Sequence, residues 1–147
     1  MALVVVDKLK VGTTLRVFLV DDSDSFRRSA GRYLSRLGSC ELVGTASSGA
    51  EALDCAAALR PDLVLVDIAM PEMDGLEVAR RLKSQAVPPR AVMLTVHDDP
   101  RYRAAAREAG ADGFIVKSDF TLQVVALLHE LAQQGKEAPM RSDKGLA

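Results

Sequence analysis

Five polar side chains follow short apolar runs of this sequence: Asp21, Asp22, Asp67, Thr95 and Lys117. Carboxylates that lie close together repel each other and disfavour joint ionisation. A hard divalent cation such as Mg²⁺ relieves that repulsion, because it prefers oxygen ligands and keeps several of its waters. If the fold brings the three acids together, the set predicts a Mg²⁺ site that Mn²⁺ can also occupy.

The same residues fit the attachment of a phosphoryl group to one carboxylate. The cation and Lys117 would neutralise the charge that develops on the oxygens, and Thr95 would donate a hydrogen bond to one of them. The protein would then contribute positioning and electrostatics, with little covalent chemistry beyond the attacking carboxylate. Taken singly, each residue has an ordinary structural interpretation as a helix cap, a turn residue or a solvated lysine. The hypothesis therefore depends on the whole set.

The elements that must position these side chains alternate regularly. Apolar runs typical of strands occur at 15–20, 41–46, 62–66, 90–96 and 111–116. Helical patterns occur at 26–37, 48–59, 74–84, 99–110 and 118–134. This alternation predicts a parallel sheet covered on both faces, with right-handed crossovers.

The predicted fold class is therefore α/β. We expect a flavodoxin-like (βα)5 three-layer sandwich, with a parallel five-stranded sheet of order 2-1-3-4-5. Ligands of such sheets bind at the carboxyl ends of the strands, beside the switch point between strands 1 and 3. The acids at the ends of the first and third runs should meet there.

Length and charge are those of one ordinary domain. The chain has 147 residues, with 19 Lys or Arg and 20 Asp or Glu, so its formal net charge is −1. This balance gives no sign of nucleic-acid or membrane binding, and no apolar run approaches membrane-spanning length. We expect an N-terminal extension at 1–14, one domain at 15–134, and a flexible tail or the start of a linker at 135–147.

Two cysteines, Cys40 and Cys55, lie in segments that read as core elements. Buried free thiols are favoured over a disulfide between them, which indicates a reducing compartment. A cytoplasmic location is the matching expectation.

Four strings of the sequence together resemble a known family. They are Val20-Asp21-Asp22, the stretch 65–75 (LVDIAMPEMDG), Leu94-Thr95 and the stretch 113–117 (GFIVK). In combination they are similar to the receiver domain of bacterial two-component response regulators, the CheY-like fold, over residues 15–134. Their amino-acid sequence is most similar to that of receivers of LuxR/NarL-type transcription factors.

The resemblance implies a role for each acid. Asp67 would be the phosphoacceptor. Asp22 and Asp67 would bind Mg²⁺ directly together with the backbone carbonyl of Ala69, and Asp21 would act through a metal-bound water.

Lys117 would pair with Asp67 and later with the phosphoryl oxygens, and Thr95 and Phe114 would form the switch pair. The implied partner is a sensor histidine kinase, and a homodimer formed on phosphorylation is also considered. The chain would be a signalling phosphoacceptor that promotes its own phosphorylation and dephosphorylation, and not an enzyme in the usual sense. Its output would regulate transcription through a DNA-binding domain that these residues do not include, so no direct contact with nucleic acid or membrane is expected.

Several positions depart from the commonest pattern of the family. Lys117 is followed by Ser118 where many members have a proline with a cis peptide bond, so the isomer of this bond is open. Ala69 offers no hydrogen-bonding side chain to an attacking water, and branched Val96 would crowd the approach beside Thr95. Both favour slow loss of the phosphoryl group, whereas His97 could act the other way.

The arginines of the first helix have two readings, of which a solvated face is favoured and a partner-docking surface is the alternative. They are Arg27, Arg28, Arg32 and Arg36.

Three other classes of protein fit less well. A receiver-like module that takes no phosphate typically lacks one of the acids or the lysine, and all are present. A haloacid-dehalogenase-type hydrolase needs a second acid two residues after the nucleophile, where this chain has Ala69. A dinucleotide-binding domain needs a G-x-G-x-x-G string after the first strand, and none follows.

Overall fold

The structure, a computed structural model, describes residues 14–146, with side chains described through residue 134. The N-terminal extension expected at 1–14 therefore lies almost wholly outside the described residues. Within the described part, no helix is long and apolar enough to cross a membrane.

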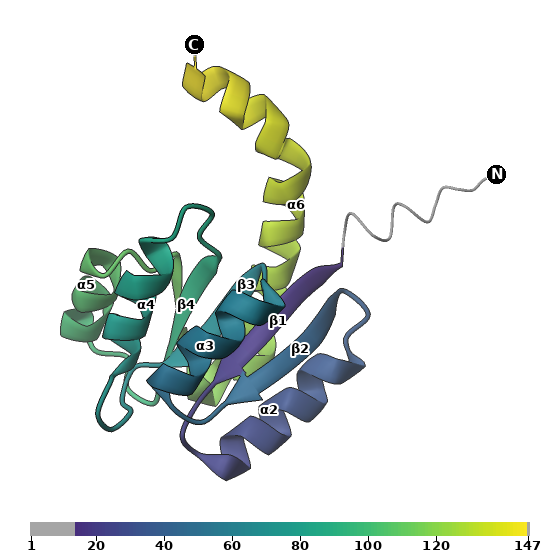
Figure 1. The fold of residues 1–147 in the computed structure, drawn as a ribbon. Coiled ribbons are helices and arrows are strands. Elements are labelled where there is room, and N and C mark those ends of the chain that lie inside the picture. The colour runs from purple at the N-terminus through teal and green to yellow at the C-terminus, as the bar shows by residue number, and fades with distance from the viewer. Residues whose placement is uncertain (1–13, 147) are drawn as a thin grey trace.

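A five-stranded parallel sheet forms the centre of the molecule, with the strand order β2-β1-β3-β4-β5 (Figure 1). This confirms the predicted α/β fold class and its topology. All five residues of β3 are buried, as the apolar composition of this central strand requires. The strands are β1 (Leu15–Val20), β2 (Cys40–Ala46), β3 (Leu63–Asp67), β4 (Arg90–Thr95) and β5 (Gly113–Val116).

Helices cover both faces of the sheet, which gives the three predicted layers (Figure 1). One apolar cluster joins the sheet to α3, α4 and α5, and the other joins it to α2 and α6. The helices are α2 (Asp24–Arg36), α3 (Gly49–Leu59), α4 (Gly75–Lys83), α5 (Pro100–Glu108) and α6 (Phe120–Leu146).

The last helix begins where the sequence predicted but ends later. A 3-10 turn, η1 (Lys117–Asp119), precedes α6, which begins at Phe120, directly after the predicted cap at Ser118 or Asp119. It then runs to Leu146, beyond the end predicted at Gln134. A glycine inside a helix costs only about 1 kcal/mol, and good helix formers flank Gly135, so this residue does not end the helix.

Side-chain caps start the helices that follow β1, β3 and β4. The side chain of Ser23 accepts a hydrogen bond from the backbone N–H of Phe26, and that of Asp74 accepts one from Glu77. Asp99 caps α5 as predicted, with Pro100 as the first helical residue. These caps fix the loops that leave β1, β3 and β4 at one edge of the sheet.

Gly75 holds the loop after β3 against the strand itself. Its N–H donates to the carbonyl of Ile68 at 2.9 Å. A Cβ atom at this position would lie 2.2 Å from the carbonyl oxygen of Asp67, a backbone atom that cannot move aside freely. The close approach therefore requires glycine, although its φ angle lies outside the left-handed region.

We predict that Gly75→Ala lowers the free energy of unfolding by about 2 kcal/mol or more, because the loop or the end of β3 must shift. Chemical denaturation of the purified variant measures the change. Gly38→Ala is the matched control, because no atom lies within 4 Å of the Cβ it would add. Equal stability of the two variants would contradict the argument.

Candidate functional site

The register of the sheet brings the predicted residues to one edge. Val20 pairs with Val66, so the residues that follow them, Asp21 and Asp67, are neighbours across β1 and β3. Thr95 pairs with Val116, so Lys117 follows directly beside the end of β4. All of these positions lie at the carboxyl ends of parallel strands, as the topology predicts.

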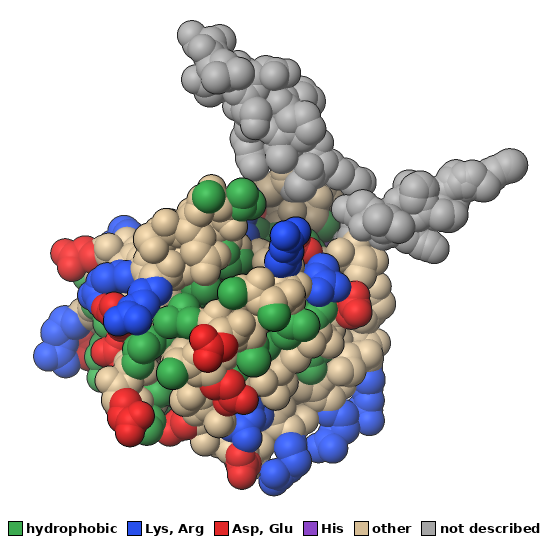
Figure 2. Space-filling model, in the orientation of Figure 1, with side chains coloured by type: hydrophobic (Ala, Val, Ile, Leu, Met, Phe, Trp, Pro, Cys, Tyr) green, Lys and Arg blue, Asp and Glu red, His purple; other side chains and the backbone are tan. Residues whose placement is uncertain are grey.

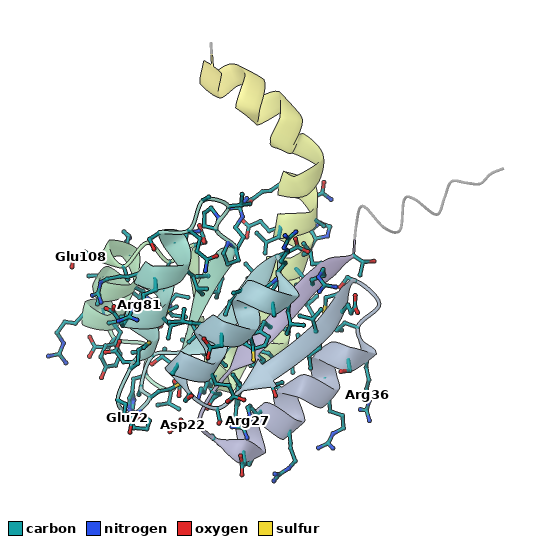
Figure 3. The ribbon with its side chains drawn as sticks, viewed as in Figure 1. Asp22, Arg27, Arg36, Glu72, Arg81 and Glu108 are labelled. Atoms are coloured by element: carbon teal, nitrogen blue, oxygen red, sulfur yellow. The ribbon has the colours of Figure 1, made fainter. Side chains whose placement is uncertain are left out.

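The three acids form one cluster. Carboxylate oxygens of Asp21, Asp22 and Asp67 all lie within 4.8 Å of one another. Asp21 is fully buried and Asp67 is 6 % exposed, whereas Asp22 is exposed. In Figure 3, Asp22 and Glu72, from the loop after β3, lie at the same end of the molecule.

This donor set fits Mg²⁺ or Mn²⁺. Both cations take carboxylate oxygens, and an exposed ligand such as Asp22 leaves room for the waters that Mg²⁺ retains. Asp21 Oδ2 is buried and has an ionic partner, the Lys117 ammonium, but no neutral hydrogen-bond donor among the described residues, so this carboxylate is surrounded as an acceptor of cations. The backbone N–H of Ala69 donates to Asp67 Oδ1 at 3.3 Å, while a metal contact of its carbonyl remains a prediction.

Lys117 connects two of the acids. Its Nζ lies 2.6 Å from Asp21 Oδ2 and 3.5 Å from Asp67 Oδ2. The lysine side chain is only 14 % exposed, so water screens these interactions weakly. The other oxygen of Asp21 accepts a hydrogen bond from the backbone N–H of Ser23 at 2.9 Å, which orients the carboxylate toward the lysine.

The electrostatics of the cluster act most strongly on Asp67. The pKa of its carboxyl is raised from 3.8 to about 6, first because burial disfavours the charged form and second because the charge of Asp21 repels it. The charge of Asp22 also raises this pKa, to a smaller extent. Lys117 and the N–H of Ala69 lower it, but without overcoming burial and repulsion.

Thr95 is buried and satisfied within its own loop. Its hydroxyl donates to the carbonyl of His97 at 3.2 Å and accepts from the backbone N–H of His97 at 3.1 Å. Val96 is 63 % exposed, and His97 is exposed as well. The hydroxyl thus stands beside the acids but is engaged with the loop after β4.

Phe114, the second residue of the expected switch pair, is partly buried in β5. The guanidinium of Arg103 lies 4.5 Å from the centre of its ring and pairs with Asp98 at 2.7 Å. Arg103 therefore joins β5 to the loop that follows Thr95. No sequence pattern predicts this contact, because it depends on where α5 packs.

Two open questions from the sequence have answers in the structure. No peptide bond among residues 14–146 is cis, so the bond between Lys117 and Ser118 is trans. Cys40 and Cys55 are free thiols, Cys40 buried and Cys55 partly so, as expected.

The arginines of α2 divide into two kinds. Arg27 donates to the backbone carbonyl of Asp21 at 2.6 Å and pairs with Asp24, so it belongs to the turn beside the site. Arg28, Arg32 and Arg36 are exposed at spacings of four residues. Figure 2 shows the basic side chains along α2, at the lower right of the view.

The raised pKa of Asp67 predicts a stability that depends on pH in metal-free buffer. The folded state holds a proton between about pH 4 and 6 that the unfolded chain has lost, so stability falls as pH rises through this window. The free energy of unfolding of Asp67→Asn should therefore be about 2 to 3 kcal/mol higher than that of wild type at pH 7. The difference should vanish below about pH 4. Urea denaturation with EDTA across this range measures it, and a difference independent of pH would refute the assignment.

Comparison with known proteins identifies the family. The model of the response regulator receiver domain matches residues 17–129. The chain is 37 % identical over 119 residues to the transcriptional regulatory protein NarL of Mycobacterium tuberculosis, covering 81 % of this chain and 55 % of that protein. It is 38 % identical over 107 residues to the response regulator protein VraR of Staphylococcus aureus, covering 71 % and 50 %. The chain thus spans about half the length of these relatives.

Solved structures agree with the sequence comparisons. The signal receiver domain of NarL from Mycobacterium tuberculosis superposes with a TM-score of 0.76 at 37 % identity, over 82 % of this chain and 97 % of that one. The response regulator domain of CheB from Thermotoga maritima superposes with a TM-score of 0.71 at 30 % identity, over 83 % and 96 %. With the predicted fold confirmed and the acids gathered at the strand ends, the chain belongs to the response regulator receiver domain family.

Proposed function

We propose that this chain takes a phosphoryl group onto Asp67 from a phosphohistidine of a sensor histidine kinase. The observation that carries the proposal is the cluster of three carboxylates within 4.8 Å, with Lys117 bridging Asp21 and Asp67. A receiver-like module that never takes phosphate would have no need for this complete set. The proposed place of action is the cytoplasm, where two-component response regulators work.

In the proposed reaction, a carboxylate oxygen of Asp67 attacks the phosphorus atom. The new P–O bond forms as the P–N bond to the donor imidazole breaks, and the imidazole leaves with the electron pair of that bond. Lys117 is within reach of the phosphoryl oxygens, because its Nζ already lies 3.5 Å from Asp67 Oδ2. Its charge would stabilise the transition state by electrostatics alone.

Bound Mg²⁺ would supply the remaining positive charge that a phosphoryl group between acids requires. Asp22 and Asp67 are the proposed direct ligands with the Ala69 carbonyl, and Mn²⁺ is a proposed substitute. Asp21 is engaged with Lys117 and the Ser23 N–H, which supports a contact through water.

The proposed switch uses Thr95 and Phe114. To reach a phosphoryl oxygen, the Thr95 hydroxyl must give up its bonds to His97. Movement of that loop would release space for the ring of Phe114 and alter the surface around β4, α5 and β5. By analogy with its relatives, the proposed output is transcription regulation, with homodimerisation on phosphorylation as one route.

We predict that acetyl phosphate with Mg²⁺ phosphorylates the chain on Asp67 alone, as measured by mass spectrometry of the intact protein and its peptides. Asp67→Asn should remain unmodified, because the other acids of the described cluster are the fully buried Asp21, which is paired with Lys117, and the exposed Asp22. Asp22→Ala should weaken Mg²⁺ binding by tenfold or more, on the order of the loss of one charged ligand. Asp54→Ala, at a position in α3, is the control. Full modification of Asp67→Asn would refute the assignment.

We also predict a phosphorylated form that lasts minutes or longer. Ala69 is exposed beside Asp67 and offers no side chain to orient an attacking water, and Val96 stands next to Thr95. Ala69→Asn should accelerate decay by supplying a hydrogen-bonding group, and Val96→Ala should do so by opening the approach. Decay of the phosphorylated protein in Mg²⁺ is followed by gel or mass spectrometry. Decay of the wild type within seconds, or unchanged rates in both variants, would disprove the water-access argument.

A further inference from the structure

The Lys117 ammonium has a third neighbour besides Asp21 and Asp67. Its Nζ lies 4.6 Å from the centre of the Phe26 ring, over the face of that ring. A cation at this distance from an aromatic face is attracted by the ring quadrupole, and more strongly where water is excluded. With a lysine side chain that is only 14 % exposed, the ring stands where a water would otherwise solvate the charge.

The position of Phe26 is fixed by the same turn that carries the acids. Asp21 Oδ1 accepts from the Ser23 N–H, and Ser23 Oγ accepts from the Phe26 N–H at 3.2 Å. The Phe26 ring packs against the ring of Phe120 at 5.4 Å between centroids and 79° between planes. Phe120 is itself buried, so the ring over the lysine is held from two directions.

We propose that Phe26 is a positioning residue for phosphoryl transfer to Asp67, acting through Lys117; this inference rests on the function proposed above. An ammonium group has three N–H donors and no acceptor. The ring attracts its charge without offering a conventional hydrogen-bond acceptor, so the donors turn toward the carboxylates. The lysine is thereby directed at the place where the phosphoryl oxygens arrive.

A purely structural role for Phe26 is the competing explanation, since the ring also joins α2 to α6. Substitutions separate the two. Phe26→Leu keeps an apolar side chain and removes the aromatic face, whereas Phe26→Tyr keeps the face. Phe26 lines a groove of about 450 Å³, where we expect the added hydroxyl to be accommodated. Tyr33→Leu is the matched control, because the Tyr33 ring lies 6.4 Å from the same Phe120 ring, whereas the ring under Lys117 Nζ is that of Phe26.

The first measurement needs no phosphate. The Lys117 Nζ lies over the Phe26 ring, so the ring current should move the NMR signal of the neighbouring Cε protons upfield. That displacement should disappear in Phe26→Leu and persist in Phe26→Tyr and Tyr33→Leu. A Lys117 signal unchanged by Phe26→Leu would overturn the proposal.

The second measurement is the rate of phosphorylation by acetyl phosphate at saturating Mg²⁺. Phe26→Leu should react about three- to tenfold more slowly, while Phe26→Tyr and Tyr33→Leu stay within about twofold of wild type. A Phe26→Leu rate equal to wild type, or a Phe26→Tyr rate as low as that of Phe26→Leu, would overturn the proposal. Circular dichroism checks folding, and Phe26→Met replaces Phe26→Leu if the latter is unfolded.

The two measurements also separate this proposal from the function on which it rests. A wild-type chain that takes no phosphate on Asp67 refutes the proposed function, whatever the variants do. The NMR arm then still decides whether the ring holds the ammonium. A phosphorylated wild type with no effect of Phe26→Leu refutes the role of Phe26 alone.

Discussion

Repulsion among three carboxylates in one partly buried corner is the constraint on which the rest of this molecule depends. Asp21, Asp22 and Asp67 come within 4.8 Å because parallel strands end side by side, and the fold tolerates this at a cost. The cost is visible in Asp67, whose carboxyl pKa is raised to about 6, first by burial and then by the charge of Asp21, despite a lysine nearby. A corner of this kind is poised to bind positive charge, and a group that arrives with its own cation relieves the strain.

A positive charge beside these acids comes from the Lys117 ammonium, and its neighbours fix the position of that group. Lys117 reaches the acids from the end of β5 and is backed by an aromatic ring from α2. Thr95 stands close by, with its hydroxyl committed to the next loop. The acids, the lysine and its ring are thus placed in advance, whereas the hydroxyl must change partners before it can take part.

Strand ends were the informative part of the sequence. Asp67 and Lys117 could be assigned to the same edge of the sheet because the alternation of apolar runs predicts the topology, and the topology determines which strand ends are neighbours. The contact of Phe26 with Lys117 could not be predicted, since it depends on the rotamers of both side chains and on how α2 packs against α6. The end of α6 was also missed, because Gly135 weakens a helix too little to end it.

The two loops beside the acidic cluster differ in how tightly they are held, and Gly75 is the cause. Backbone lies against backbone there, with no side chain between the start of α4 and the end of β3, and the N–H of Gly75 is bonded to Ile68. The loop between β3 and α4 therefore has little room to move. On the opposite side, the loop after β4 is exposed at Val96, His97 and Asp98 and is held by a few side-chain contacts. A change at Asp67 would therefore be taken up by the loop after β4 more readily than by the loop that Gly75 holds against β3.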